Sequence, residues 1–134
     1  GKPHLKHSDK HISITHCGDY AAAIISDNDS AGIDLEKVNP RILRVGHKFA
    51  VSEEKEILAK HTPEMALHII WGVKESLYKL FATPGLSFKS HLKIQEFDST
   101  EGQLMGECHH DVINQKHKLV HLSLGDYHCA YTIN

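Results

Sequence analysis

The chain has 134 residues, a length typical of one compact domain that buries a single hydrophobic core. Its 40% apolar and 24% charged residues and its formal net charge of -2 exclude a disordered acidic tail and a strongly basic nucleic-acid binder. Thirteen histidines are the unusual feature. With a pI near 6.7, they predict a net charge that becomes positive on mild acidification.

No stretch of the sequence reaches the about 18 to 20 uninterrupted apolar residues needed to cross a bilayer, and the first residues lack the apolar region of a signal peptide. We therefore expect a cytoplasmic protein without a membrane partner. Three cysteines are far apart in the sequence and never in Cys-x-x-Cys spacing: Cys17, Cys108 and Cys129. This spacing favours buried thiols over disulfides or a zinc site.

Three short strands are predicted in the first part of the chain, at residues 12–16, 21–26 and 31–36, where apolar and polar residues alternate or a short apolar run occurs. Turn-forming residues separate these segments at positions 18–19 and 27–29. The pattern indicates a hairpin followed by a third strand.

The middle of the chain is predicted to be helical. Residues 40–61 fit two short helices, and Ser52 is the expected N-cap of the second. A longer helix of about 19 residues is expected to begin at Pro63, with Thr62 as its N-cap and a broad apolar stripe up to Phe81. This helix is the best candidate for the centre of the domain.

Four further strands are predicted after the long helix, at residues 92–97, 103–108, 118–124 and 127–133. The order of strands, helices and strands predicts an α+β fold in which an antiparallel sheet packs on the long helix. No repeat and no linker separates two domains, so residues 1–134 are expected to form a single domain.

Two carboxylates, Asp34 and Glu36, are two residues apart on a predicted strand and therefore share one face. They repel each other unless a positive charge lies between them, and Mg²⁺ meets this need because it prefers oxygen ligands. An exposed polar face of the strand explains the same pattern without a metal.

Charged residues also interrupt the apolar stripe of the long helix. Glu75 and Lys79 are at i and i+4, so a surface ion pair explains them simply. Trp71 and Tyr78 flank these charges, and a lysine and a glutamate beside aromatic rings on a buried helix are also suited to a functional site.

Five segments, taken in order, resemble the 4'-phosphopantetheinyl transferase superfamily, in the branch typified by the enzyme that activates surfactin synthetase. The segments are Gly1-Lys2-Pro3, Ile12-Ser13-Ile14-Thr15-His16, Gly32-Ile33-Asp34-Leu35-Glu36, Phe49 with Ser52-Glu53-Glu54, and Trp71-Gly72-Val73-Lys74-Glu75-Ser76-Leu77-Tyr78-Lys79. The resemblance extends over about residues 1–80. It implies the fold of this superfamily, of which the chain would form one half.

The resemblance implies an enzyme that transfers the 4'-phosphopantetheine group of coenzyme A to a serine of an acyl or peptidyl carrier protein and releases adenosine 3',5'-bisphosphate. It implies Mg²⁺ as cofactor, bound by Asp34, Glu36 and Glu75 on the coenzyme A pyrophosphate. Lys79 matches the lysine proposed to neutralise or protonate the leaving phosphate oxygen. Glu54 matches a glutamate proposed to deprotonate the carrier serine through water, a role for which Glu75 and water itself remain alternatives.

Three further residues are expected at coenzyme A from the same resemblance. His16 matches a histidine that contacts the phosphates, and Lys2 matches a lysine near the adenine and 3'-phosphate end. Lys74 occupies a position beside the nucleotide. Gly72 departs from the pattern, because a small polar residue is common at that place in the family.

Members of this branch are usually chains of two similar halves that bind coenzyme A between them, and this chain resembles the second half. We therefore expect a C-terminal portion of a longer transferase that self-associates through the interface left by the first half. A basic patch for an acidic carrier protein is expected on the short helices, at Arg41, Arg44, Lys48 and Lys55, although a solvated helix face gives the same pattern.

Two alternatives to the transferase remain. One is a non-catalytic module of the same fold that binds coenzyme A or a carrier protein. The other is a histidine-rich metal-binding domain, for which His109, His110, His117 and His121 are the candidates. Solvated positions on half-exposed strands are the simpler interpretation of these histidines.

Overall fold

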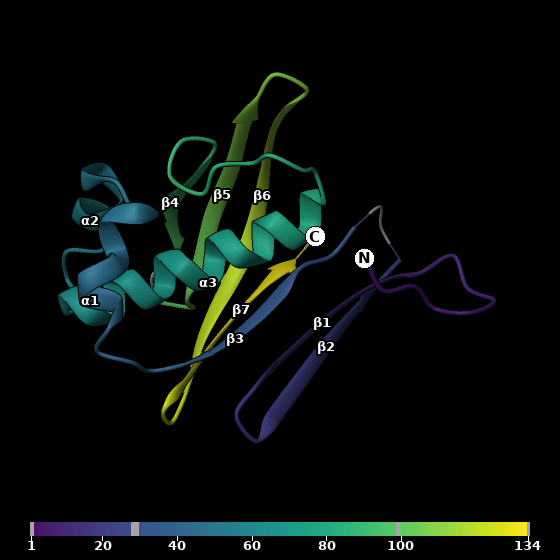
Figure 1. Ribbon diagram of the computed structural model, residues 1–134, viewed down its shortest axis with the longest axis horizontal. Coiled ribbons are helices and arrows are strands. Elements are labelled where there is room, and N and C mark those ends of the chain that lie inside the picture. Colours follow the sequence, from purple (N-terminus) through teal and green to yellow (C-terminus); the bar gives the residue numbers. More distant parts are fainter. Residues whose placement is uncertain (1, 28–29, 99, 134) are drawn as a thin grey trace.

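A computed structural model describes residues 2–27, 30–98 and 100–133. Helix α3 crosses one face of a five-stranded antiparallel sheet, the short helices α1 and α2 lie near one end of α3, and a two-stranded hairpin lies beside the sheet (Figure 1). The elements are β1 His11–Cys17, β2 Tyr20–Ser26, β3 Ile33–Lys37, α1 Ile42–Val45, the 3-10 turn η1 Gly46–Lys48, α2 Ser52–Ile57, α3 Pro63–Phe81, β4 Leu92–Asp98, β5 Gln103–His110, β6 Ile113–Leu124 and β7 Tyr127–Ile133. This arrangement confirms the predicted α+β fold.

The five-stranded sheet has the order β3-β7-β6-β5-β4, and each neighbouring pair is antiparallel. Strand β6 begins five residues before its predicted start, at Ile113. Residues 113–117 are mostly polar, but their backbone continues the ladder with β5 up to the pair His110 and Ile113. Backbone pairing rather than burial therefore sets the start of this strand.

Helix α3 has the predicted bounds. The Met65 N–H donates to Thr62 Oγ1 at 3.2 Å, and Pro63 occupies the first turn. The helix ends at Ala82, which adopts a left-handed conformation with a φ of 48°. Its apolar stripe packs on the sheet, and Ile70, Val73 and Leu77 are fully buried there. This contact forms the main hydrophobic core.

The start of helix α2 differs from the prediction. Val51, not Ser52, is the N-cap residue, and it provides no side-chain cap. Instead, the Val51 N–H donates to Glu54 Oε1 at 3.0 Å. The glutamate within the first turn thus satisfies the N–H of the N-cap residue, which is a different contact from the one expected of the serine.

The β1–β2 hairpin forms a sheet of its own, with the predicted turn at Gly18 in a left-handed conformation. Side chains rather than backbone carbonyls connect it to β3: the N–H groups of Ile33 and Leu35 donate to Ser13 Oγ and Thr15 Oγ1, each at 3.1 Å. The second predicted turn, at 27–29, falls largely outside the described residues.

Two further expectations concern single features. Cys17, Cys108 and Cys129 are free thiols, as their spacing predicts; Cys108 and Cys129 are buried as expected, whereas Cys17 is only half-buried. Among the helices within the described residues, none combines the length and hydropathy required to cross a membrane.

Candidate active site

Asp34 lies on β3 and points toward helix α3, with only 4% of its surface exposed. Gly72 of this helix lies beside it, since a Cβ at Gly72 would be 4.0 Å from Asp34 Oδ2, an ordinary contact distance. Within the described part of the chain, no group donates a hydrogen bond to this buried Oδ2. Burial, reinforced by the neighbouring Glu36 carboxylate, raises the pKa of Asp34 to about 8, and Lys79 opposes the rise.

Glu36 and Glu75 approach Asp34 from the strand and from the helix. Trp71 Nε1 donates a hydrogen bond to Glu36 Oε1 at 3.1 Å. Burial raises the pKa of Glu75; the positive charge of Lys79 opposes this rise and the negative charge of Glu36 adds to it. The charges of the three carboxylates therefore repel one another, and a hydrogen bond between the Asp34 and Glu36 side chains also raises the pKa of Asp34.

Lys79 is the cation beside these carboxylates. Its Nζ lies 3.6 Å from Asp34 Oδ1 and donates to the carbonyl oxygens of Ile33 at 2.8 Å and Ile14 at 3.3 Å. The side chain is 30% exposed and connects α3, β3 and the hairpin. Lys79 is thus held at the carboxylates by backbone acceptors and keeps contact with solvent.

The chemistry of this site suits a divalent cation. Mg²⁺ is usually bound by one or two carboxylates, with water or phosphate oxygens completing its shell. Asp34 and Glu36 supply two neighbouring carboxylates, and the unpartnered Asp34 Oδ2 lacks a positive group to satisfy it. Over the described residues, no three His, Cys, Asp or Glu side chains converge on one metal position, so Glu75 as third ligand stays a prediction.

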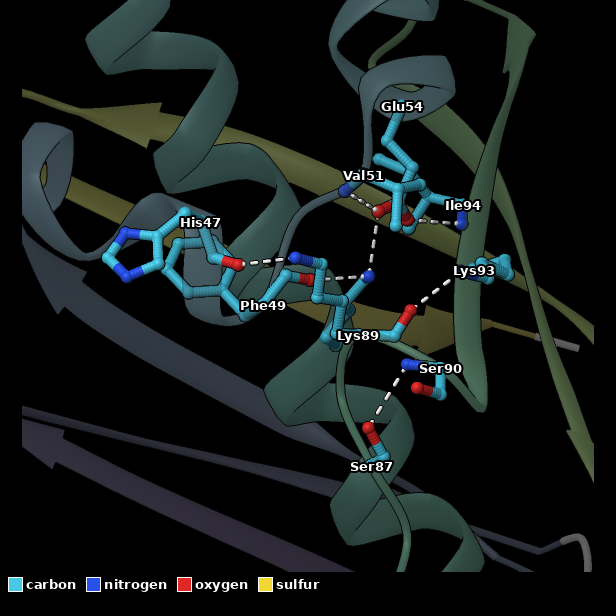
Figure 2. A network of polar contacts seen from close by, with 10 residues as sticks. His47, Phe49, Val51, Glu54, Ser87, Lys89, Ser90, Lys93 and Ile94 are labelled. Carbon is cyan, nitrogen blue, oxygen red and sulfur yellow. Dashed lines mark hydrogen bonds and ion pairs between the residues drawn. The ribbon is translucent and has the colours of Figure 1, made fainter.

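Glu54 and Lys74 lie elsewhere, in a buried network between α2, α3 and β4 (Figure 2). Lys74 Nζ donates to Glu54 Oε1 and to the Phe49 carbonyl oxygen, each at 2.7 Å. Glu54 also accepts from the N–H groups of Val51 and Ile94, each at 3.0 Å.

Lys74 is 0% exposed and Glu54 is 1% exposed. In this structure neither side chain has a surface for a nucleotide or a water molecule, and the roles of Lys74 beside a nucleotide and of Glu54 as a base remain predictions. Each group is enclosed by protein, and their charges satisfy each other.

Lys2 and His16 are not brought to the carboxylates. Ser13 and Thr15 face β3, so His16, which alternates with them on β1, is exposed on the opposite face of the hairpin. Lys2 lines a separate hollow of about 230 Å³ in the N-terminal segment. Their contacts with coenzyme A remain predictions.

A cavity of about 640 Å³ opens next to the carboxylates. Glu36 and Trp71 form part of its wall, together with the ring of Phe88. Arg41 and Lys48 line it from the segment of the short helices. Lys37 also lines it, so the cavity combines an aromatic wall, a carboxylate and three cations.

The histidines predicted to be solvated differ from one another. His109 is exposed, but His121 is half-buried and its Nε2 lies 2.8 Å from His128 Nδ1. The His128 ring stacks on His68 of helix α3, with the ring centroids 4.9 Å apart. His121 is thus part of an internal column of rings, which its strand position alone does not reveal.

A family model of the 4'-phosphopantetheinyl transferase superfamily matches residues 30–132. The chain belongs to this superfamily. The match includes the carboxylates and Lys79, whereas Lys2 and His16 precede the matched segment.

Three 4'-phosphopantetheinyl transferases of Bacillus subtilis are similar to parts of the chain, each at 32% identity. The first is similar over 91 residues, which cover 65% of this chain and 40% of that protein. The transferase named ffp is similar over 72 residues, or 52% of this chain and 32% of its own length. The transferase Sfp of strain 168 is similar over 83 residues, or 59% and 37%. The chain thus spans about 40% or less of these relatives.

One contact in the candidate active site could not be predicted from the sequence. Trp71 stands out in the sequence only as an aromatic residue beside charges, and its partner Glu36 is 35 positions away. The alternation of β3 and the helical spacing of α3 predict which faces the two residues occupy. They do not predict that those faces meet at this pair.

Proposed function

We propose that this chain carries the metal-binding site of an enzyme that transfers the 4'-phosphopantetheine group of coenzyme A to a serine of an acyl or peptidyl carrier protein. The reaction releases adenosine 3',5'-bisphosphate. The observation that carries this proposal is the buried Asp34 carboxylate beside Glu36 in a chain of this superfamily: its Oδ2 accepts no hydrogen bond from the described residues, and its Oδ1 lies 3.6 Å from Lys79 Nζ.

The charges of the site fit phosphoryl-type transfer, which needs charge neutralisation more than covalent help from the protein. Mg²⁺, when bound, would polarise the pyrophosphate of coenzyme A. Asp34 and Glu36 would hold the cation, with Glu75 as a third carboxylate. Lys79, fixed by the Ile33 carbonyl, would place its ammonium where the leaving phosphate gains negative charge.

The carrier protein supplies the serine nucleophile, so the chain needs no nucleophile of its own. The proposed docking region is the segment of the short helices, where Arg41, Arg44, Lys48 and Lys55 are all exposed. An acidic carrier protein complements this charge. Arg41 and Lys48 of this region line the same cavity as Glu36, and the proposal places the pantetheine arm in that cavity.

A labelling assay tests the proposal. The chain, Mg²⁺, a fluorescent coenzyme A and an apo carrier protein are incubated, and transfer to the carrier is followed on a gel. We expect Asp34→Asn to slow labelling by about 100-fold or more, because it removes a charged ligand while keeping the shape of the side chain. Asp111→Asn, at an exposed position, is the matched control and should label at the parent rate.

The second candidate function is a non-catalytic module of the same fold that binds coenzyme A or a carrier protein. Calorimetry with coenzyme A and Mg²⁺ separates the two: binding without any labelling supports the module, and labelling supports the transferase. Self-association remains a prediction that light scattering would check. Ile14 and Ile25, 48% and 56% exposed on the hairpin, are the apolar surface available to it.

A further inference from the structure

Glu36 is the less constrained of the two neighbouring carboxylates on β3. Asp34 is short and almost fully buried, whereas Glu36 has one more rotatable bond and is half-buried near the end of the strand. When both carboxylates are ionised, as the binding of a divalent cation requires, they repel each other. Glu36 would therefore leave Asp34 unless another group held it.

Trp71 provides that group. Its indole Nε1 donates to Glu36 Oε1 at 3.1 Å, from helix α3 to strand β3. This donor is neutral, so it fixes the position of the carboxylate and leaves its negative charge uncompensated. A lysine at the same place would neutralise that charge. It occupies Oε1 and leaves Oε2 for another partner.

The indole itself has little freedom to move. Phe49 packs edge-on against it with the ring centroids 4.9 Å apart, and Phe88 packs on it at 5.3 Å. The neighbouring helix residues Ile70 and Val73 are fully buried and anchor this turn of α3. The hydrogen-bond donor thus has a fixed position from which to orient a flexible carboxylate.

We infer that Trp71 is a positioning residue that holds Glu36 beside Asp34 for a divalent cation. This inference rests on the proposed function. Partners that orient a metal ligand typically change metal affinity 10- to 100-fold when they are removed. Trp71 would act through Glu36 and need not touch the cation or the substrate.

Mn²⁺ binding, measured by calorimetry with inorganic pyrophosphate present, tests the inference without any need for turnover. Trp71→Phe keeps an aromatic ring between Phe49 and Phe88 but lacks the N–H, and we expect its Mn²⁺ affinity to fall about 10- to 100-fold. Tyr78→Phe, on the same helix and against the same Phe88 ring, is the matched control and should stay within about twofold of the parent.

A second variant separates the hydrogen bond from ring packing. Phe88→Leu loosens the packing around the indole but keeps its N–H. If this variant loses as much Mn²⁺ affinity as Trp71→Phe, packing explains the effect and the inference is wrong. Thermal unfolding of each variant, with a transition as cooperative as that of the parent, confirms that it is folded.

The hydrogen bond can also be observed directly, because Trp71 is the single tryptophan of the chain. Its indole N–H gives one cross-peak in a ¹H–¹⁵N spectrum, and we expect Glu36→Gln to move that peak while Asp111→Asn leaves it in place. If Glu36→Gln leaves the position of this peak unchanged, the inference is wrong.

The outcomes separate the inference from the proposed function. If the parent binds Mn²⁺, Asp34→Asn does not, and Trp71→Phe binds as tightly as the parent, only the role of Trp71 is refuted. If the parent binds no Mn²⁺ even with pyrophosphate, the metal site and the inference fail together.

Discussion

Two glycines lie where strand β3 and helix α3 meet, and their surroundings differ. A Cβ on Gly32 would overlap the carbonyl oxygen of Ser76, so the close approach of strand and helix depends on the missing side chain. A Cβ on Gly72 would meet the Cβ of Ala130 at 3.4 Å, an ordinary contact. No steric contact therefore requires glycine at position 72, although glycine loses more conformational entropy than alanine when the helix forms.

Opposite changes in stability are expected when each glycine is replaced by alanine. Gly72→Ala should raise the free energy of unfolding by about 0.5–1 kcal/mol, because alanine is the better helix former. Gly32→Ala should lower it by about 1–3 kcal/mol through overpacking. Urea unfolding of the two variants beside the parent measures both changes. A loss of stability in Gly72→Ala would show that this turn of α3 is tighter than the structure describes.

Two adjacent side chains of helix α3 belong to two separate groups of polar residues. Successive residues of a helix are about 100° apart around its axis, so Lys74 and Glu75 point in different directions. Lys74 reaches Glu54 between α2 and β4, and Glu75 faces the β3 carboxylates. The buried ion pair between Lys74 and Glu54 thus fixes the orientation of helix α3, and with it the direction in which Glu75 faces the candidate active site.

Removal of Lys74 should strongly destabilise the fold. Lys74→Met leaves Glu54 buried without its cation, and breaking such a pair typically costs about 3–5 kcal/mol. Lys60→Met is the matched control, because Lys60 and Glu96 form an ion pair at 2.6 Å with side chains 48% and 31% exposed. That change should cost no more than about 1 kcal/mol. Equal unfolding midpoints for the two variants would contradict a structural role for Lys74.

The whole fold shows which features a sequence can predict. Helix α3 was predictable to the residue, because its cap, its proline and its apolar stripe are local signals. The pairing of Asp34 with Glu36 followed from strand alternation alone. The burial of Lys74 and Glu54 was not predictable, because it depends on three elements meeting around two charges.

The many histidines are also divided by the fold as a whole. His68, His121 and His128 come from α3, β6 and β7 and stack inside the molecule. Burial is the main cause that lowers the pKa of each, to about 4 for His121 and His128. The charge of His68 lowers the pKa of both strand histidines further. Glu64 favours a charged His68, and His128 and His61 disfavour a charged His121 more strongly than His68 does.

Acid should therefore destabilise the molecule between about pH 6.5 and pH 4. Below a pH of about 6.5 the unfolded chain takes up protons on these histidines, whereas in the folded chain His121 and His128 stay neutral until about pH 4. The free energy of unfolding therefore falls as the pH drops toward about 4. Asp34, whose raised pKa of about 8 makes the folded chain take up a proton that the unfolded chain does not, offsets the effect of about one histidine in that window. Each strongly shifted histidine contributes about 1.4 kcal/mol per pH unit over that window. Urea unfolding at pH 7 and pH 5 measures the loss.

His121→Gln should reduce this loss, because the variant has one fewer histidine to protonate on unfolding. His4→Gln, at an exposed position, should leave it unchanged. If both variants lose as much stability as the parent between pH 7 and pH 5, groups outside the column set the acid sensitivity.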